Sequence, residues 1–74
     1  MDSDERFLTV REAARELGLS AMTLYRRINA NQFPALRIGS RLVVEAAVID
    51  RMAREAVRLG RVVDAADFVA KTAA

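Results

Sequence analysis

Residues 9–29, TVREAARELGLSAMTLYRRIN, decide the fold of this chain. Thr9 and Glu12 have the spacing of a capping box, in which each side chain accepts a hydrogen bond from the backbone N–H of the other residue. We therefore expect a helix to begin after Thr9. Its apolar residues recur at spacings of three and four, which is typical of one buried helix face: they are Val10, Ala13, Ala14 and Leu17.

Gly18 and Ser20 separate this helix from a second one. Glycine is a common helix terminator, and serine is a favoured N-cap. The second helix is predicted over residues 21–29, with Leu24 and Ile28 facing inward. Two short helices joined by about three residues are typical of a helix-turn-helix, in which the first helix braces the second against the major groove of DNA.

A short hairpin is predicted to follow. Pro34 ends the second helix, because the residue before a proline disfavours helical backbone. Alternating residues over 36–44 predict two very short strands around a tight turn at 39–40, and we call this hairpin the wing. Arg37 and Arg41 are expected to point the same way near its tip, where they can lie along a minor groove or a run of phosphates.

The helical period returns from Glu45 to Leu59, and Gly60 is expected to end this third helix. Asp64 is predicted to start one more helix, anchored by Phe68 and Val69. The apolar stripe predicted for the third helix consists of Val48, Ile49, Met52, Ala53, Ala56 and Val57.

The fold class that follows is mainly α with a small β-hairpin, a winged helix-turn-helix with a C-terminal helix. Three regions are predicted: a flexible amino terminus over 1–6, the winged helix-turn-helix domain over 7–59, and a C-terminal helical extension over 60–74. The extension either folds back onto the third helix and completes the core, or it docks another protein.

Size and composition exclude several functions. The chain has 74 residues, 53% of them hydrophobic and 30% charged, which describes one small globular domain. A chain of this length buries only about 60% of its unfolded surface, so a deep substrate cavity is hard to build. Cys and His are absent, which excludes disulfides, the usual zinc sites and imidazole-dependent catalysis. We expect no enzyme activity, no cofactor, no metal ion and no small-molecule ligand.

The amino terminus does not resemble an export signal, and no segment is predicted to span a membrane. The first six residues are acidic where a signal peptide would be basic, and no apolar run approaches the roughly 18 residues of a membrane span. We therefore expect a soluble, cytoplasmic protein without a membrane partner.

The basic charge is local. Residues 17–44 contain four arginines and no carboxylate, whereas residues 45–74 contain five basic and five acidic residues. Such an uninterrupted basic stretch indicates a surface for a polyanion, although four solvated arginines would produce the same pattern.

The exposed side of the second helix supplies the candidate DNA-reading residues. Arg26 lies opposite the buried direction, and an arginine there can donate two hydrogen bonds to guanine. Met22 and Thr23 can contact thymine methyls, although Met22 can equally fill a gap in packing. Tyr25 and Arg27 flank the ridge, where they can contact phosphates; Tyr25 can instead pack on the first helix or the wing, and Arg27 can remain solvated. The backbone around Ser20 can hold a phosphate at the amino end of the helix.

Three segments together resemble the excisionase family: residues 9–20 (TVREAARELGLS), 23–27 (TLYRR) and 33–41 (FPALRIGSR). Excisionases are small winged helix-turn-helix proteins related to the DNA-binding domain of MerR regulators. The resemblance covers about residues 7–59. It implies a recombination directionality factor of a bacteriophage or another integrative element, acting at the nucleoid of the bacterial host. Such a factor binds double-stranded attachment-site DNA with neighbouring copies of itself, bends it, and directs the integrase of the same element toward excision.

The resemblance also assigns roles to residues. It implies recognition-helix contacts for Thr23, Tyr25, Arg26 and Arg27, a phosphate-binding cap at Ser20, and wing contacts for Arg37, Ser40 and Arg41. Many relatives carry a second basic residue in the wing turn where this chain has Ser40, so the wing is expected to bind DNA more weakly here.

Two other hypotheses use the same sequence. A small MerR-like transcriptional regulator would use the same module to occlude or activate a promoter, and sequence does not separate this role from excision. A protein-interaction module would bind an acidic partner through the basic face, or dock a neighbouring copy or the integrase through apolar residues after Gly60, namely Val62, Val63, Phe68 and Val69.

Overall fold

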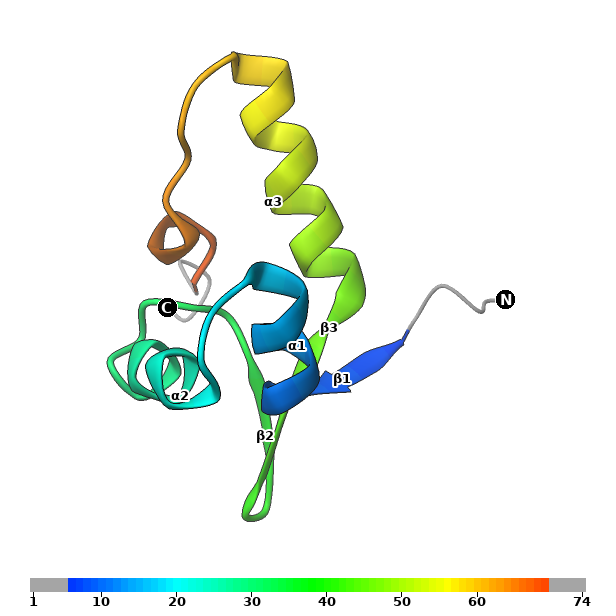
Figure 1. Ribbon diagram of the computed structural model, residues 1–74, viewed down its shortest axis with the longest axis vertical. Coiled ribbons are helices and arrows are strands. Elements are labelled where there is room, and N and C mark those ends of the chain that lie inside the picture. The colour runs from blue at the N-terminus through cyan, green and yellow to red at the C-terminus, as the bar shows by residue number, and fades with distance from the viewer. Residues whose placement is uncertain (1–5, 70–74) are drawn as a thin grey trace.

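A computed structural model describes residues 6–69 and contains three helices beside a three-stranded antiparallel sheet (Figure 1). The predicted winged helix-turn-helix is confirmed. In chain order the elements are β1 (Phe7–Thr9), α1 (Val10–Leu17), α2 (Ala21–Asn29), β2 (Leu36–Ile38), β3 (Arg41–Glu45), α3 (Ala46–Leu59) and the 3₁₀ turn η1 (Ala65–Phe68). Residues 1–5 of the predicted flexible amino terminus and residues 70–74 of the predicted extension lie outside the described residues.

The capping box at the start of α1 forms as predicted. The Thr9 hydroxyl accepts a hydrogen bond from the Glu12 N–H at 3.0 Å, and the Glu12 carboxylate accepts one from the Thr9 N–H at 2.9 Å. Two backbone donors that the first turn of a helix would otherwise leave without partners are thereby satisfied. The helix begins at Val10 for this reason.

Gly18 turns the chain from α1 into α2. Its backbone is left-handed, with φ of 76°, a conformation that costs glycine little because it has no Cβ. The Leu19 N–H bonds back to the Ala14 carbonyl at 2.8 Å, which completes the usual glycine-terminated helix end. Ser20 then caps α2, because its hydroxyl accepts the Thr23 N–H at 3.1 Å. Both predicted helices and the three-residue turn between them are therefore confirmed.

The sheet contains one strand more than the predicted hairpin. Its order is β1-β3-β2, so β3 is central and pairs with both other strands. Leu8 of β1 pairs with Val44 of β3, and both are buried. Because Thr9 ends β1 and also caps α1, the same short segment fixes the first helix against the sheet.

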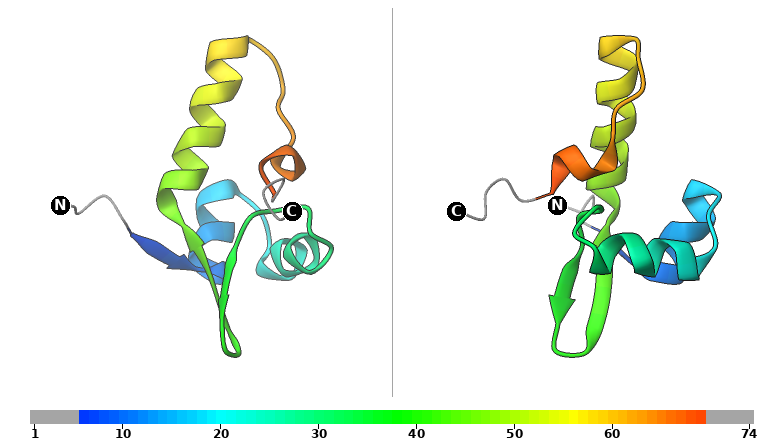
Figure 2. Two further views of the ribbon diagram at one scale, coloured as in Figure 1. Left: turned by 180° about the vertical axis from the view of Figure 1, so that it is seen from behind. Right: turned by 90° about the vertical axis from the view of Figure 1, so that its left-hand side faces the viewer.

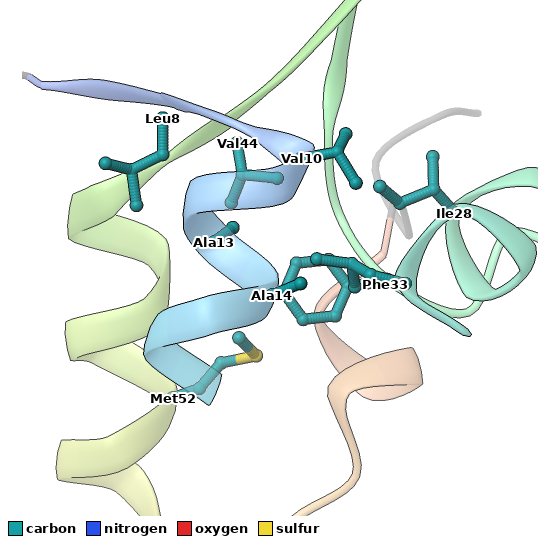
Figure 3. Packing of buried hydrophobic residues seen from close by; sticks show 9 residues of the cluster. Leu8, Val10, Ala13, Ala14, Ile28, Phe33, Val44 and Met52 are labelled. Carbon is teal, nitrogen blue, oxygen red and sulfur yellow. The ribbon is translucent and has the colours of Figure 1, made fainter. Parts of the chain in front are cut away.

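The core lies where α1 and α2 meet the sheet and the first half of α3. Figure 3 shows the buried side chains converging there. Ala13 and Ala14 are fully buried, and their small size lets α2 approach α1 closely. Full burial of a side chain such as Leu24 contributes about 1.5–3 kcal/mol. The buried cluster consists of Leu8, Val10, Ala13, Ala14, Leu24, Ile28, Phe33, Val44 and Met52.

Only part of the stripe predicted for α3 is buried. Met52 lies in the core, and Val48 and Ile49 pack against it. Val57 is 82% exposed and Ala53 is exposed, so their predicted place in the buried stripe is wrong. Five residues of helix turn the chain by about 140° from Met52, which carries Val57 to the outer side. The C-terminal half of α3 also extends beyond the other two helices, as Figures 1 and 2 show.

The C-terminal extension folds back toward the helices. Asp64 caps its one 3₁₀ turn, because the Asp64 carboxylate accepts the Ala66 N–H at 3.1 Å. Ala65 and Phe68 pack against the core cluster. The helix start predicted at Asp64 is therefore present, but the helix described is a single turn. Of the two alternatives for the extension, the packing of Phe68 favours completion of the core.

Candidate nucleic-acid interface

The outer side of α2 carries the residues predicted to read DNA. Leu24 and Ile28 are buried, which sets the inward direction of this helix as predicted. Met22, Tyr25, Arg26 and Arg27 are all exposed, and Thr23 is partly exposed. The exposed side chains of α2 are thus two arginines, a tyrosine, a methionine and the terminal Asn29, with Thr23 partly exposed.

Ser20 and Thr23 form a small polar network at the amino end of α2. The Ser20 hydroxyl accepts the Thr23 N–H and also donates to Thr23 Oγ1 at 2.9 Å. The N–H groups of Ala21 and Met22 precede the first intrahelical bond, which runs from the Leu24 N–H to the Ser20 carbonyl at 3.1 Å. Such N–H groups are suited to an anion such as a phosphate. The Ser20 hydroxyl itself is engaged in the cap.

Arg27 is held by a residue that the sequence analysis did not single out. Its Nη1 donates to Gln32 Oε1 at 2.8 Å. The contact arises from the end of α2, where Asn31 adopts a left-handed backbone with φ of 60°. The Gln32 N–H bonds to the Arg27 carbonyl at 2.8 Å, which brings the two side chains together. Asparagine is one of the few residues besides glycine that tolerate this conformation. Asn31 is therefore the sequence feature that could have indicated this turn.

Tyr25 lies outside the buried cluster and is 46% exposed. This partial exposure is compatible with both alternatives raised for it, packing on the first helix or the wing and contact with a phosphate.

Arg37 and Arg41 lie on opposite faces of the wing, contrary to the prediction. The register pairs Arg37 with Leu42, and Ile38 with Arg41. Directly paired residues share a face, and neighbours along a strand alternate. A two-residue turn pairs residue 38 with residue 41, so an odd-numbered residue on β2 shares its face with even-numbered residues on β3. The two-residue turn at 39–40 already implies this parity in the sequence.

The two wing faces differ in their surroundings. Leu42 packs against the core cluster, so Arg37 lies on the side of the sheet that the helices cover. Arg41 lies on the outer side together with Ile38, which is 61% exposed and was not predicted as a site residue. Ser40 is exposed in the turn between them.

The wing and α2 are found at the same end of the molecule. In Figures 1 and 2 the tip of the hairpin points away from the helices, in the direction opposite to the free end of α3. Helix α2 lies beside the base of the hairpin. Every residue of α2, the wing turn and β2 falls within the carboxylate-free stretch 17–44. A polyanion approaching this end therefore meets arginines from two separate elements.

Among the described residues, helix α3, unlike α2, carries an ion pair, between Arg58 and Glu55. Arg58 Nη2 lies 2.6 Å from Glu55 Oε2, and the hydrogen bond from this guanidinium lowers the pKa of Glu55. The charged residues of this helix are of both signs, namely Asp50, Arg51, Arg54, Glu55 and Arg58, whereas α2 and the wing carry arginines without any carboxylate up to residue 44.

Within residues 6–69, no group of three or more His, Cys, Asp or Glu side chains is arranged to hold a metal ion. None of the described helices is long and apolar enough to cross a membrane.

Comparison with known proteins agrees with the geometry. The family model described as Helix-turn-helix domain matches residues 7–57, which is more than two thirds of the chain. This range runs from β1 through the wing into α3. No curated protein and no solved structure matches the chain significantly. The chain therefore belongs to the Helix-turn-helix domain family, whose fold is a DNA-binding one.

Proposed function

We propose that this protein is a sequence-specific, DNA-bending accessory factor, an excisionase that directs the integrase of its own element toward excision. The proposal rests on one observation: exposed arginines of α2 and arginines of the wing lie at the same end of the molecule, within residues 17–44, which contain no carboxylate. Two of the three segments that resemble excisionases, residues 23–27 and 33–41, lie in α2 and around the wing, and the third contains α1. Its place of action would be the nucleoid of a bacterial host.

Arg26 is proposed to read a base in the major groove. It lies on the side of α2 opposite the buried Leu24, and arginine can donate two hydrogen bonds to the O6 and N7 atoms of guanine. Met22 and Thr23 are proposed to contact thymine methyls on either side.

The remaining site residues are proposed to hold the phosphate backbone. Tyr25 and Arg27 flank the helix ridge, the N–H groups after Ser20 point from the amino end of α2, and Ser40 stands in the exposed turn of the wing. Such contacts position a protein on the duplex without specifying sequence. Arg37 and Arg41, on opposite faces of the wing, extend the contact to a second groove.

Cooperative binding is part of the proposal because one module is small. A single unit of this size buries limited DNA surface and makes few phosphate contacts, so one copy binds modestly and with strong salt dependence. Several copies on adjacent sites raise the affinity and accumulate bending. The partners proposed are therefore double-stranded DNA, neighbouring copies of the chain and the integrase.

The test begins with a duplex that the native chain selects from a random-sequence library. That site is then moved along a DNA fragment of constant length, and the mobility of each complex is compared. A bending factor gives slowest migration when the site is central, and equal mobility at every position would contradict bending. A plasmid excision assay with the integrase of the same element follows. Excised circles that form only when both proteins are present support the excisionase role, whereas specific binding without any effect on excision would favour the transcriptional alternative.

A further inference from the structure

The tip of the wing carries an exposed apolar side chain next to its arginines. Ile38 is 61% exposed and stands one residue before the Gly39–Ser40 turn. In both figures of the whole chain the wing tip is the part of the sheet that projects farthest from the helices. Single exposed apolar residues are common on proteins, so position rather than exposure alone decides what Ile38 does.

The strand register sets what surrounds Ile38. It pairs directly with Arg41, and the preceding Arg37 lies on the opposite face of the wing. The tip therefore presents Ile38 beside Arg41 on one face and Arg37 on the other. The two faces of the tip thus carry one arginine each, and the two walls of a DNA groove supply phosphates on both sides.

Leu36 provides a contrast on the same strand and the same face. It lies at the base of the wing, 46% exposed, and borders a groove of about 300 Å³ together with Phe7, Pro34, Ala35, Glu45 and Val48. Its apolar neighbours belong to the chain itself. Ile38 is beyond this groove, so the same explanation does not extend to it.

We propose that Ile38 enters the minor groove of the bound DNA as an apolar contact, with Arg37 and Arg41 bound to the phosphates on either side. The inference rests on the proposed DNA-binding function and adds to it the residue that bends the duplex. The minor groove is about 6 Å wide, and proteins that insert an apolar side chain there open it and bend the DNA toward the major groove. The opposite directions of the two arginines match the two strands that form the groove walls.

The experiment compares Ile38→Thr with Leu36→Thr. Threonine is β-branched, so it suits a strand in both places, and each variant replaces an apolar side chain with a partly polar one on the same face. Binding is measured by fluorescence anisotropy on a single-site duplex selected by the native chain, and bending by the moved-site mobility assay. Thermal unfolding checks that both variants fold.

The proposal predicts that Ile38→Thr weakens single-site binding about five- to tenfold and reduces the bend, while Leu36→Thr changes neither. The salt dependence of binding by Ile38→Thr stays native, because an apolar contact releases no counterions. Arg41→Ala, in contrast, lowers the salt slope by about one. The conservative Ile38→Val retains most of the affinity and the bend.

Several results would overturn the proposal. Native affinity and bend in Ile38→Thr would show that the tip does not enter the groove. Loss of cooperativity on a two-site duplex in both threonine variants, with single-site affinity unchanged, would make this face a contact between copies. If the native chain selects no duplex at all, both the proposed function and the proposed role of Ile38 are wrong. If the native chain binds DNA but Ile38→Thr behaves like the native chain, only the role of Ile38 is wrong and the DNA-binding function is retained.

Discussion

Arg27 and Gln32 meet because the backbone turns sharply at Asn31. This left-handed residue ends α2 and returns the chain so that the Gln32 amide oxygen accepts a hydrogen bond from Arg27. A free arginine loses considerable side-chain freedom when it binds a phosphate. Gln32 restricts part of that freedom beforehand and leaves other guanidinium N–H groups available, so we propose it as a positioning residue for the proposed phosphate contact of Arg27.

The variant Gln32→Ala is expected to weaken DNA binding about two- to tenfold, because Arg27 must then be ordered on binding. The salt slope should stay native, since Arg27 still binds its phosphate. Arg27→Ala should lower that slope by about one. A double-mutant cycle on the selected duplex measures the coupling: Gln32→Ala should cost nothing further once Arg27 is alanine. An equal cost in both backgrounds would mean that Gln32 contacts DNA itself.

At the scale of elements, local chemistry explains where the helices begin. The start of α1 depends on the reciprocal bonds between Thr9 and Glu12, and the start of α2 depends on the Ser20 hydroxyl. Each cap satisfies donors of the first helical turn that have no partner inside the helix. The orientation of α2 therefore depends on a few polar side chains as well as on the core.

Thr9→Ala is expected to lower the free energy of unfolding by about 0.5–2 kcal/mol, because the Glu12 N–H loses its acceptor. Thr9→Ser keeps the hydroxyl and should remain close to native stability. Urea unfolding followed by circular dichroism compares the three proteins. Equal midpoints for Thr9→Ala and the native chain would show that the capping box contributes nothing to stability.

The elements that were predictable are those specified by neighbours in sequence. Capping residues, glycine ends and the 3.6-residue period identify α1, α2 and α3, and the turn at 39–40 identifies the wing. The strand β1 was missed because it has only three residues and exists through pairing with β3, which lies more than thirty residues away. The exposure of Val57 was also not readable, because periodicity cannot tell how far along α3 the rest of the protein reaches.

Part of the candidate site was also predictable from the sequence, namely which residues of α2 are exposed. Burial of Leu24 and Ile28 leaves the predicted side of α2 exposed, since a helix of known period has only one outer side. The wing arginines were identified by residue, but their directions were wrong because strand pairing sets them. Gln32 and Ile38 acquire significance only through contacts or positions that the folded chain creates.

At the scale of the whole molecule, the C-terminal extension joins the far end of α3 to the region around α2. Phe68 and Ala65 pack against the core cluster, and residues 63–66 border a groove of about 490 Å³ that Arg27, Gln32 and Phe33 also line. Val62, before this turn, is 87% exposed. Phe68 and Ala65 of the extension thus contribute to the packed core, whereas Val62 faces solvent.

Phe68→Ala is expected to lower the free energy of unfolding by about 1–2 kcal/mol, because a half-buried aromatic ring leaves the core. Val62→Ser should leave stability unchanged. Urea unfolding measures both, and gel shifts on a two-site duplex measure cooperativity. Native stability in Phe68→Ala would contradict the packing role of the extension. Loss of cooperativity in Val62→Ser would instead support docking of a neighbouring copy or the integrase through the extension.

The proposed function depends above all on the exposed side of α2, which we propose reads DNA sequence. The most direct test is a fluorescence anisotropy titration of the selected duplex and a scrambled one with the native chain, Arg26→Ala and Arg54→Ala. Arg54 is exposed on α3, so its variant makes the same charge change away from α2 and the wing. We predict that Arg26→Ala loses about 5- to 150-fold on the selected duplex and little on the scrambled one, while Arg54→Ala keeps the native ratio. An unchanged ratio of the two affinities in Arg26→Ala would contradict the claim and leave α2 as a nonspecific basic surface.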